Sequence, residues 1–144
     1  MTTYLLDVNV LIALIDPAHV QHDTAHTWFK ARGGRSWASC PLTENGVLRI
    51  VSHSKYPNPI GSPALAASVM ARLCKVPGHV FWPDDISVLD DTHVDATRLL
   101  SSSQITDSYL LALASAHKGQ LATFDSRLVV EAVRKGRSAL HLIK

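Results

Sequence analysis

Short apolar segments alternate with amphipathic helical patterns along the whole chain, and this alternation limits the possible folds more than any other feature. Each apolar segment is four or five residues long, which is typical of a buried strand. Parallel strands need long crossover connections, usually helices, so the pattern predicts an α/β domain with a mainly parallel sheet. We expect strands at 3–6, 36–39, 79–82, 120–123 and 139–143, and helices at 8–15, 19–30, 44–52, 64–75, 93–100 and 107–118.

Length and composition indicate one globular domain spanning residues 1–144. Hydrophobic residues make up 47% of the chain and charged residues 18%, which excludes a disordered or fibrous protein. No apolar run approaches the roughly 18 residues that a membrane span requires, and no basic segment precedes the first strand as in a secretory signal. The two cysteines, Cys40 and Cys74, lie far apart and form no C-x-x-C motif, so we expect neither a disulfide framework nor a zinc knuckle. We therefore expect a cytoplasmic protein with no membrane partner.

Four acidic residues occupy related positions in this pattern. Asp7 and Asp125 each follow an apolar strand, and Glu44 and Asp107 each open a helix at the start of its apolar stripe. In a parallel α/β domain, the carboxyl ends of strands and the N-termini of helices share one edge, where ligands bind. We therefore expect all four carboxylates to surround one crevice.

Such a cluster is electrostatically unfavourable without a cation. Neighbouring carboxylates repel each other, and no Lys or Arg adjoins Asp7, Glu44 or Asp107 in the sequence. Mg²⁺ or Mn²⁺ prefers oxygen ligands and would neutralise the group. Asn9 could add an amide oxygen or position a water molecule, and three threonines close to the acids could orient them, namely Thr43, Thr106 and Thr123.

A structural interpretation exists for each acid taken singly. Acidic residues are common in the first turn of a helix, and Thr43 and Thr106 resemble N-caps. Capping explains neither the two aspartates at strand ends nor the alignment of Glu44 and Asp107 with apolar stripes. We therefore favour a metal site for the set of four.

Four blocks of sequence resemble the PIN-domain nucleases, and within them the VapC toxins of bacterial toxin–antitoxin pairs. Their order and spacing fit over essentially the whole chain, and no acid of the motif is missing. The blocks are Leu5-Leu6-Asp7-Val8-Asn9-Val10-Leu11, Thr43-Glu44-Asn45-Gly46-Val47-Leu48-Arg49, Ile105-Thr106-Asp107-Ser108-Tyr109-Leu110-Leu111-Ala112-Leu113-Ala114 and Leu121-Ala122-Thr123-Phe124-Asp125.

The resemblance implies a PIN-like three-layer α/β/α domain with a five-stranded sheet. It implies a Mg²⁺-dependent endoribonuclease, with Mn²⁺ as a substitute, that leaves 5′-phosphate and 3′-hydroxyl ends. It also implies inhibition by a cognate antitoxin, and usually homodimers. In this scheme the metal is held, directly or through water, by Asp7, Glu44, Asp107 and Asp125.

Basic residues are concentrated in the last fifth of the chain, although the formal net charge is only +2. They follow Asp125 closely enough to contact RNA phosphates near the site, or they form a solvated surface. These candidates for RNA contact are Arg127, Arg134, Lys135 and Arg137. A histidine set, His19, His22 and His26, has the spacing of one helix face; an exposed face is the simpler interpretation, and a soft metal site the alternative.

Four other functions share some of these sequence features. A stand-alone PIN nuclease, or a catalytically silent module that binds RNA or protein, would share the same residues. An aspartate-nucleophile phosphatase of the haloacid-dehalogenase kind expects an acid two residues after the first, where this chain has Asn9. A response-regulator receiver would need an acidic pair after the first strand, which Asp7-Val8-Asn9 does not provide.

Overall fold

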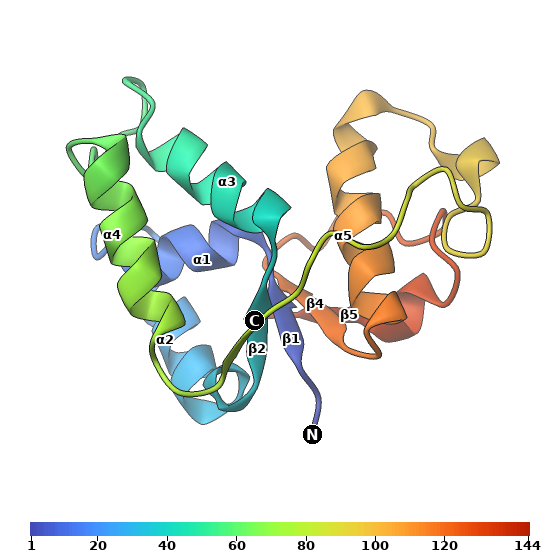
Figure 1. Cartoon of the computed structure of the whole chain (residues 1–144), viewed down its shortest axis with the longest axis horizontal. Helices are drawn as coiled ribbons and strands as arrows, with labels where there is room; N and C mark the ends of the chain where they lie inside the picture. Colours follow the sequence, from blue (N-terminus) through green and yellow to red (C-terminus); the bar gives the residue numbers. More distant parts are fainter.

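Five short strands form one sheet at the centre of the protein, as a computed structural model of residues 1–144 shows (Figure 1). Helices cover both of its faces. The strands are β1 (Tyr4–Leu6), β2 (Trp37–Ser39), β3 (His79–Phe81), β4 (Gln120–Thr123) and β5 (Leu140–Leu142). The helices are α1 (Val8–Ile15), α2 (His22–Ala31), α3 (Pro41–Val51), α4 (Pro63–Cys74) and α5 (Ile105–Ala116).

All four strand pairings are parallel, and the strand order is β3-β2-β1-β4-β5. Tyr4 of β1 pairs with Trp37 on one side and with Gln120 on the other. The chain first builds the sheet outward from β1 to β3, then crosses over to add β4 and β5 on the other side. The order in which strands are added thus reverses between β1 and β4. Ligands of open parallel sheets bind outside the carboxyl ends of the strands at such a point.

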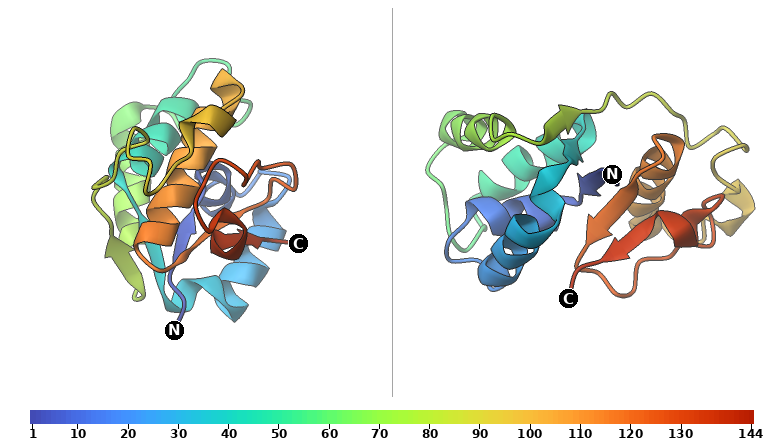
Figure 2. Two further views of the ribbon diagram at one scale, coloured as in Figure 1. Left: turned by 90° about the vertical axis from the view of Figure 1, so that its right-hand side faces the viewer. Right: turned by 90° about the horizontal axis from the view of Figure 1, so that it is seen from below.

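The two faces of the sheet bury two separate apolar layers. Tyr4 and Leu6 pack in the cluster that contains α1 to α4, while Leu5 between them packs in the cluster that contains α5. This alternation follows from the two-residue period of a strand. Figures 1 and 2 show α1 to α4 on one side of the sheet and α5 on the other, so the predicted three-layer α/β/α architecture is confirmed.

All five predicted strands and five of the six predicted helices are present, but α3, α4 and α5 begin one to three residues earlier than expected. Pro41 occupies the first position of α3, a site that suits its fixed φ angle and missing N–H group. Cys40 and Gln104 are therefore the N-cap residues of α3 and α5, and the prediction that Thr43 and Thr106 are N-caps is wrong.

The expected helix at 93–100 is also wrong, because only a 3-10 turn at Ala96–Arg98 forms there. Val94 is drawn into an isolated β-bridge with Val133, and the backbone N–H of Asp95 donates to the carbonyl of Ala132 at 2.7 Å. The Asp95 carboxylate then accepts from the N–H of Thr97 at 3.1 Å. These tertiary contacts hold the segment extended and outweigh its weak helical pattern.

Helix α2 begins at His22, three residues later than expected, and its histidines attach it to the end of α1. Ring nitrogens of His22 and His26 lie 2.7 and 2.9 Å from the carbonyl oxygens of Ala13 and Leu14. These contacts use carbonyls that are unpaired at a helix C-terminus, so the histidines have a structural role. No helix of the chain has the length and apolar character needed to cross a bilayer.

Candidate functional site: an acidic trio at the sheet edge

The carboxylate of Asp7 is fixed where β1 passes into α1. Asp7 is the N-cap residue of α1, and its Oδ1 accepts a hydrogen bond from the backbone N–H of Val8 at 2.8 Å. Its Oδ2 accepts from the hydroxyl of Thr123, the last residue of β4, at 2.7 Å. Asp7 and Thr123 are both buried. The carboxylate therefore points across the boundary between β1 and β4, where the strand order reverses.

Asp125 lies two residues beyond β4 and is exposed. Its backbone N–H donates to the Thr123 hydroxyl oxygen at 3.1 Å, and its Oδ1 accepts from the N–H of Arg127 at 2.8 Å. Thr123 thus contacts both aspartates: its hydroxyl donates to the Asp7 carboxylate and accepts from the backbone N–H of Asp125.

Asp107 lies in the first turn of α5 and completes a group that we call the acidic trio: Asp7, Asp107 and Asp125. With Asp125 and Arg127 it lines a pocket of about 220 Å³, whose wall also includes Gln104 and Leu128. The first turn of a helix stabilises a negative charge such as that of Asp107, because the unpaired N–H groups and the positive end of the helix dipole lie at this end.

The three carboxylates interact strongly with one another. Burial, followed by the charges of Asp7 and Asp125, raises the pKa of Asp107 to about 6. Burial also raises the pKa of Asp7, against the opposing effect of its hydrogen bonds and with a further contribution from Asp125. No Lys or Arg side chain forms a salt bridge with any of the three. The trio therefore concentrates negative charge that no residue of the chain neutralises.

The donor set fits a hard divalent cation. All the side-chain donors of the trio are carboxylate oxygens, the ligands that Mg²⁺ and Mn²⁺ prefer. Asp125 and Asp107 border an open pocket, so a cation and its water molecules have access to them. A divalent ion would remove the repulsion that raises the pKa of Asp107.

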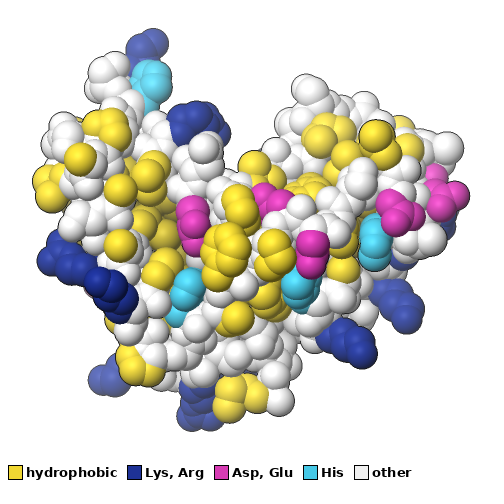
Figure 3. All heavy atoms as spheres, in the orientation of Figure 1, with side chains coloured by type: hydrophobic (Ala, Val, Ile, Leu, Met, Phe, Trp, Pro, Cys, Tyr) yellow, Lys and Arg dark blue, Asp and Glu magenta, His cyan; other side chains and the backbone are white.

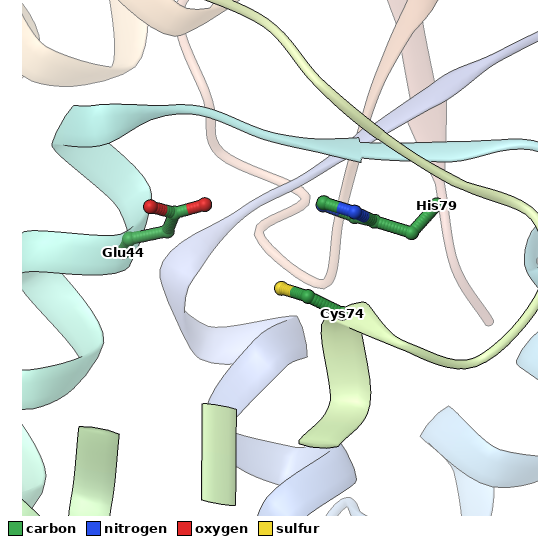
Figure 4. Close-up of side chains that lie close together, drawn as sticks. All are labelled: Glu44, Cys74 and His79. Atoms are coloured by element: carbon green, nitrogen blue, oxygen red, sulfur yellow. The ribbon is translucent and has the colours of Figure 1, made fainter. Parts of the chain in front are cut away.

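Glu44 lies at the same edge of the sheet, in the first turn of α3, but its carboxylate points into different surroundings. Its Oε2 accepts a hydrogen bond from the Ser39 hydroxyl at 2.6 Å, and it faces Cys74 and His79 (Figure 4). Its surroundings form a second, more apolar pocket of about 330 Å³. The structure thus brings three of the four predicted acids into one charge cluster and gives the fourth other partners. Acidic side chains line the floor of a hollow between the α3–α4 side and the α5 side (Figure 3).

The other predicted site residues are dispersed. Asn9 and Thr106 are exposed, and the hydroxyl of Thr43 bonds to the backbone of Cys40 rather than to an acid. Of the three threonines only Thr123 contacts a carboxylate of the site.

The four basic residues are also separated from one another. Arg127 borders the acidic trio, whereas Lys135 lines a pocket with Thr2 and Gln120 at the amino ends of β1 and β4. Arg134 donates to the carbonyl of Asp91 at 3.1 Å, and Arg137 is exposed in the 3-10 turn Gly136–Ala139. Of the four, only Arg127 lines the pocket of the acidic trio.

Ser39, Cys74 and His79 are site residues that the sequence did not reveal. Ser39 ends β2 just as Asp7 follows β1, and His79 begins β3, which is paired with β2. Cys74 and His79 are separated by four residues, a spacing compatible with metal ligands. The clearest available signal was a polar residue at the end of an otherwise apolar strand.

Comparison with known proteins identifies relatives over nearly the whole chain. A family model described as the PIN domain matches residues 4–133. The chain is 46% identical to ribonuclease VapC44 of Mycobacterium tuberculosis over 138 residues, 96% of each protein. It is 40% identical to ribonuclease VapC39 of the same organism over 126 residues, 88% of this chain and 91% of that protein.

Solved structures with the same fold are more distant in sequence. VapC20 of Mycobacterium tuberculosis, a toxin that cleaves the sarcin-ricin loop, aligns with a TM-score of 0.62 at 13% identity, covering 91% of this chain and 99% of that one. VapBC2 from Rickettsia felis, bound to a DNA fragment from its promoter, aligns with a TM-score of 0.60 at 11% identity and 99% coverage of both chains. At these identities the likeness establishes the fold alone.

Proposed function

This chain belongs to the PIN-domain family, and we propose that it is a metal-dependent endoribonuclease that acts as the toxin of a toxin–antitoxin pair. The observation that carries this proposal is the acidic trio at the reversal point of the sheet, which no cation of the chain neutralises. The names of its relatives at 40% and 46% identity, both ribonucleases, support the reaction class.

We infer that Asp7, Asp107 and Asp125 hold Mg²⁺ or Mn²⁺, and that Glu44 joins them through water from its position on α3. When bound, the ion lowers the pKa of a water molecule and offsets negative charge on the attacked phosphate. Asp7 supplies a fixed carboxylate, because Val8 and Thr123 hold both of its oxygens. Asp125 is exposed and lines the pocket of the trio, so a substrate phosphate has access to it.

Arg127 gives this site a contact for the sugar–phosphate backbone. The backbone N–H of Arg127 donates to the Asp125 carboxylate, and Arg127 lines the pocket of the trio. Its guanidinium can therefore reach a phosphate next to the scissile bond. We expect an unpaired or exposed RNA segment as substrate, because the narrow major groove of an A-form duplex resists entry by side chains.

The partner that we propose is an antitoxin protein that blocks the same edge of the sheet. An arginine of such a protein would pair with the uncompensated carboxylates. We also propose a homodimer and a cytoplasmic location, where the RNA substrate is found.

Cleavage of total cellular RNA tests the catalytic proposal. The purified protein is compared in Mg²⁺, in Mn²⁺ and in EDTA, beside Asp107→Asn and a matched exposed acid, Asp23→Asn. We expect discrete fragments with either metal that disappear in EDTA and in Asp107→Asn but persist in Asp23→Asn. Equal behaviour of the wild type and Asp107→Asn would reject ribonuclease activity and leave a silent binding module or a phosphatase.

Copurification tests the partner. The untagged product of the gene next to this one is co-expressed with the tagged chain, and we expect it to copurify and to suppress RNA cleavage. A fully active monomer without any bound protein in its native cells would contradict the toxin role while leaving the nuclease proposal intact.

A further inference from the structure

Three chemically different metal ligands converge at the pocket beside Glu44. Glu44 comes from the first turn of α3, Cys74 is the last residue of α4, and His79 is the first residue of β3. One ligand atom from each lies within 4.8 Å of the other two, and the three side chains face one another (Figure 4). We call this group the Glu44–Cys74–His79 cluster. It combines an oxygen, a sulfur and a nitrogen donor, whereas the acidic trio offers side-chain oxygens only.

This difference in donors predicts a difference in metal preference. Thiolate and imidazole ligands favour Zn²⁺ and similar ions, while Mg²⁺ and Mn²⁺ favour oxygen. Zinc bonds to such ligands are about 2.0–2.3 Å long, so ligand atoms around a tetrahedral ion are about 3–4 Å apart. The observed separations approach that arrangement and need only small side-chain movements to reach it.

The surroundings of the cluster support its ligands. The hydroxyl of buried Ser39 donates to Glu44 Oε2 at 2.6 Å and lies 2.8 Å from His79 Nε2, which orients both side chains. The adjoining pocket of about 330 Å³ leaves room for a water molecule as a fourth ligand.

We propose that Glu44, Cys74 and His79 form a second metal site, specific for Zn²⁺ and related borderline ions. On binding, the Cys74 thiol releases its proton to solvent and the thiolate coordinates the ion. Glu44 is then committed to this ion and is lost to the catalytic edge, so binding inhibits RNA cleavage. The inhibitory consequence rests on the proposed function, but the binding itself does not.

Cobalt spectroscopy tests the binding directly. Co²⁺ added to the reduced protein should produce a thiolate-to-cobalt charge-transfer band and the intense visible bands of a tetrahedral site, and Zn²⁺ should abolish both. We expect Cys74→Ser to lose the thiolate band and His79→Gln to bind Co²⁺ at least tenfold more weakly. The matched controls, Cys40→Ala and exposed His53→Gln, should retain the spectrum.

Alkylation provides a second readout on the unaltered protein. Cys74 is half-buried and Cys40 is buried, so iodoacetamide should modify Cys74 first and Zn²⁺ should protect it. A wild-type protein that shows neither the thiolate band nor protection of Cys74 would overturn the proposal. So would a band that survives Cys74→Ser and disappears in Cys40→Ala.

The catalytic variant separates this proposal from the proposed function. Asp107→Asn should retain the tetrahedral cobalt spectrum whether or not the wild type cleaves RNA. Loss of that spectrum in Asp107→Asn, with retention in His79→Gln, would place the cobalt ion at the acidic trio and reject the second site. If the cobalt site is present and RNA is not cleaved, only the proposed function and the inhibitory consequence fail.

Discussion

The Thr123 hydroxyl donates a hydrogen bond to the Asp7 carboxylate at 2.7 Å, across 116 positions of sequence. This bond links the ends of β4 and β1, the two neighbouring strands at which the order of strand addition reverses. The same hydroxyl accepts from the backbone N–H of Asp125. One small side chain thus fixes the distance between two members of the acidic trio.

Thr123→Val should weaken the site while largely keeping its shape. Valine matches threonine in volume but cannot bond to Asp7 or Asp125, and removing a hydrogen bond to a buried charged group costs about 1.5–3 kcal/mol. Loss of an outer-shell partner typically lowers metal affinity about 10- to 100-fold. We therefore expect a lower Tm and a higher Mg²⁺ requirement for RNA cleavage, measured by calorimetry and by metal titration.

Thr97→Val is the matched control for this substitution. The Thr97 hydroxyl also donates to an aspartate, Asp95, at 2.6 Å, but in an exposed turn that does not line the pocket of the trio. Its loss should leave the Mg²⁺ requirement unchanged. An identical metal dependence in Thr123→Val and Thr97→Val would show that Thr123 does not support the site.

Protonation of Asp107 should contribute stability to the metal-free protein as the pH falls from about 7 to 5, whereas His79 and His141, whose pKa values burial lowers, act in the opposite direction. The pKa of Asp107 is about 6 in the folded protein, against an ordinary value of 3.8. Its ionisation therefore destabilises the fold most above about pH 6, and this penalty fades as the pH falls toward 3.8. Asp7 contributes with the same sign. Because Asp107 is only half-buried, we expect its own contribution in EDTA to be about 1 kcal/mol, or about 3 °C in Tm, measured as the pH-dependent difference between the wild type and Asp107→Asn.

Asp107→Asn isolates this effect. In EDTA at pH 7.5 the variant should melt at a higher temperature than the wild type, and the difference should shrink as the pH approaches 5. Added Mg²⁺ should stabilise the wild type more than the variant. A variant that is less stable than the wild type in EDTA at both pH values would contradict the repulsion inferred within the trio.

Gly46→Ala should disturb the contact between α3 and α1. A Cβ atom at position 46 would lie 2.9 Å from Cγ2 of Val8, a β-branched side chain with little freedom to move. The expected cost of overpacking, about 1–3 kcal/mol, exceeds the gain of about 1 kcal/mol from helix propensity. Asn45→Ala, at the exposed neighbouring position, should not destabilise the protein. Thermal melts of the two variants check the expected order.

The fold could be predicted because local and long-range signals agree. The segment from Tyr4 to Leu6 is short and apolar, and an N-cap aspartate follows it. The structure has a strand over this segment and a helix directly after the aspartate. The segment 93–100 fails for the opposite reason, since the bridge from Val94 to Val133 is a contact between distant residues that no local pattern contains. The strand order depends on the same kind of contact.

The site was only partly predictable for a similar reason. Strand ends and helix starts indicate which edge each acid occupies, and this places Asp7, Asp107 and Asp125 together. They do not indicate where a side chain turns within that edge, and the Ser39 hydroxyl holds Glu44 toward His79. Closeness in sequence to Asp125 was also a poor guide to the position of the basic residues. Arg127 lines the pocket of the acidic trio, whereas Lys135 lies near the amino ends of β1 and β4.

This separation leads to a prediction about RNA binding. Arg127 borders the acidic trio and Lys135 lies at the amino ends of the strands, so only Arg127 is placed to contact a phosphate beside the scissile bond. Arg127→Ala should weaken RNA binding and reduce the slope of log affinity against log salt by about 1. Lys135→Ala should change neither quantity, although it removes the same charge. Both are measured in Ca²⁺, with Asp107→Asn in the background to prevent cleavage, and an equal loss in the two variants would show that RNA binding follows net charge rather than position.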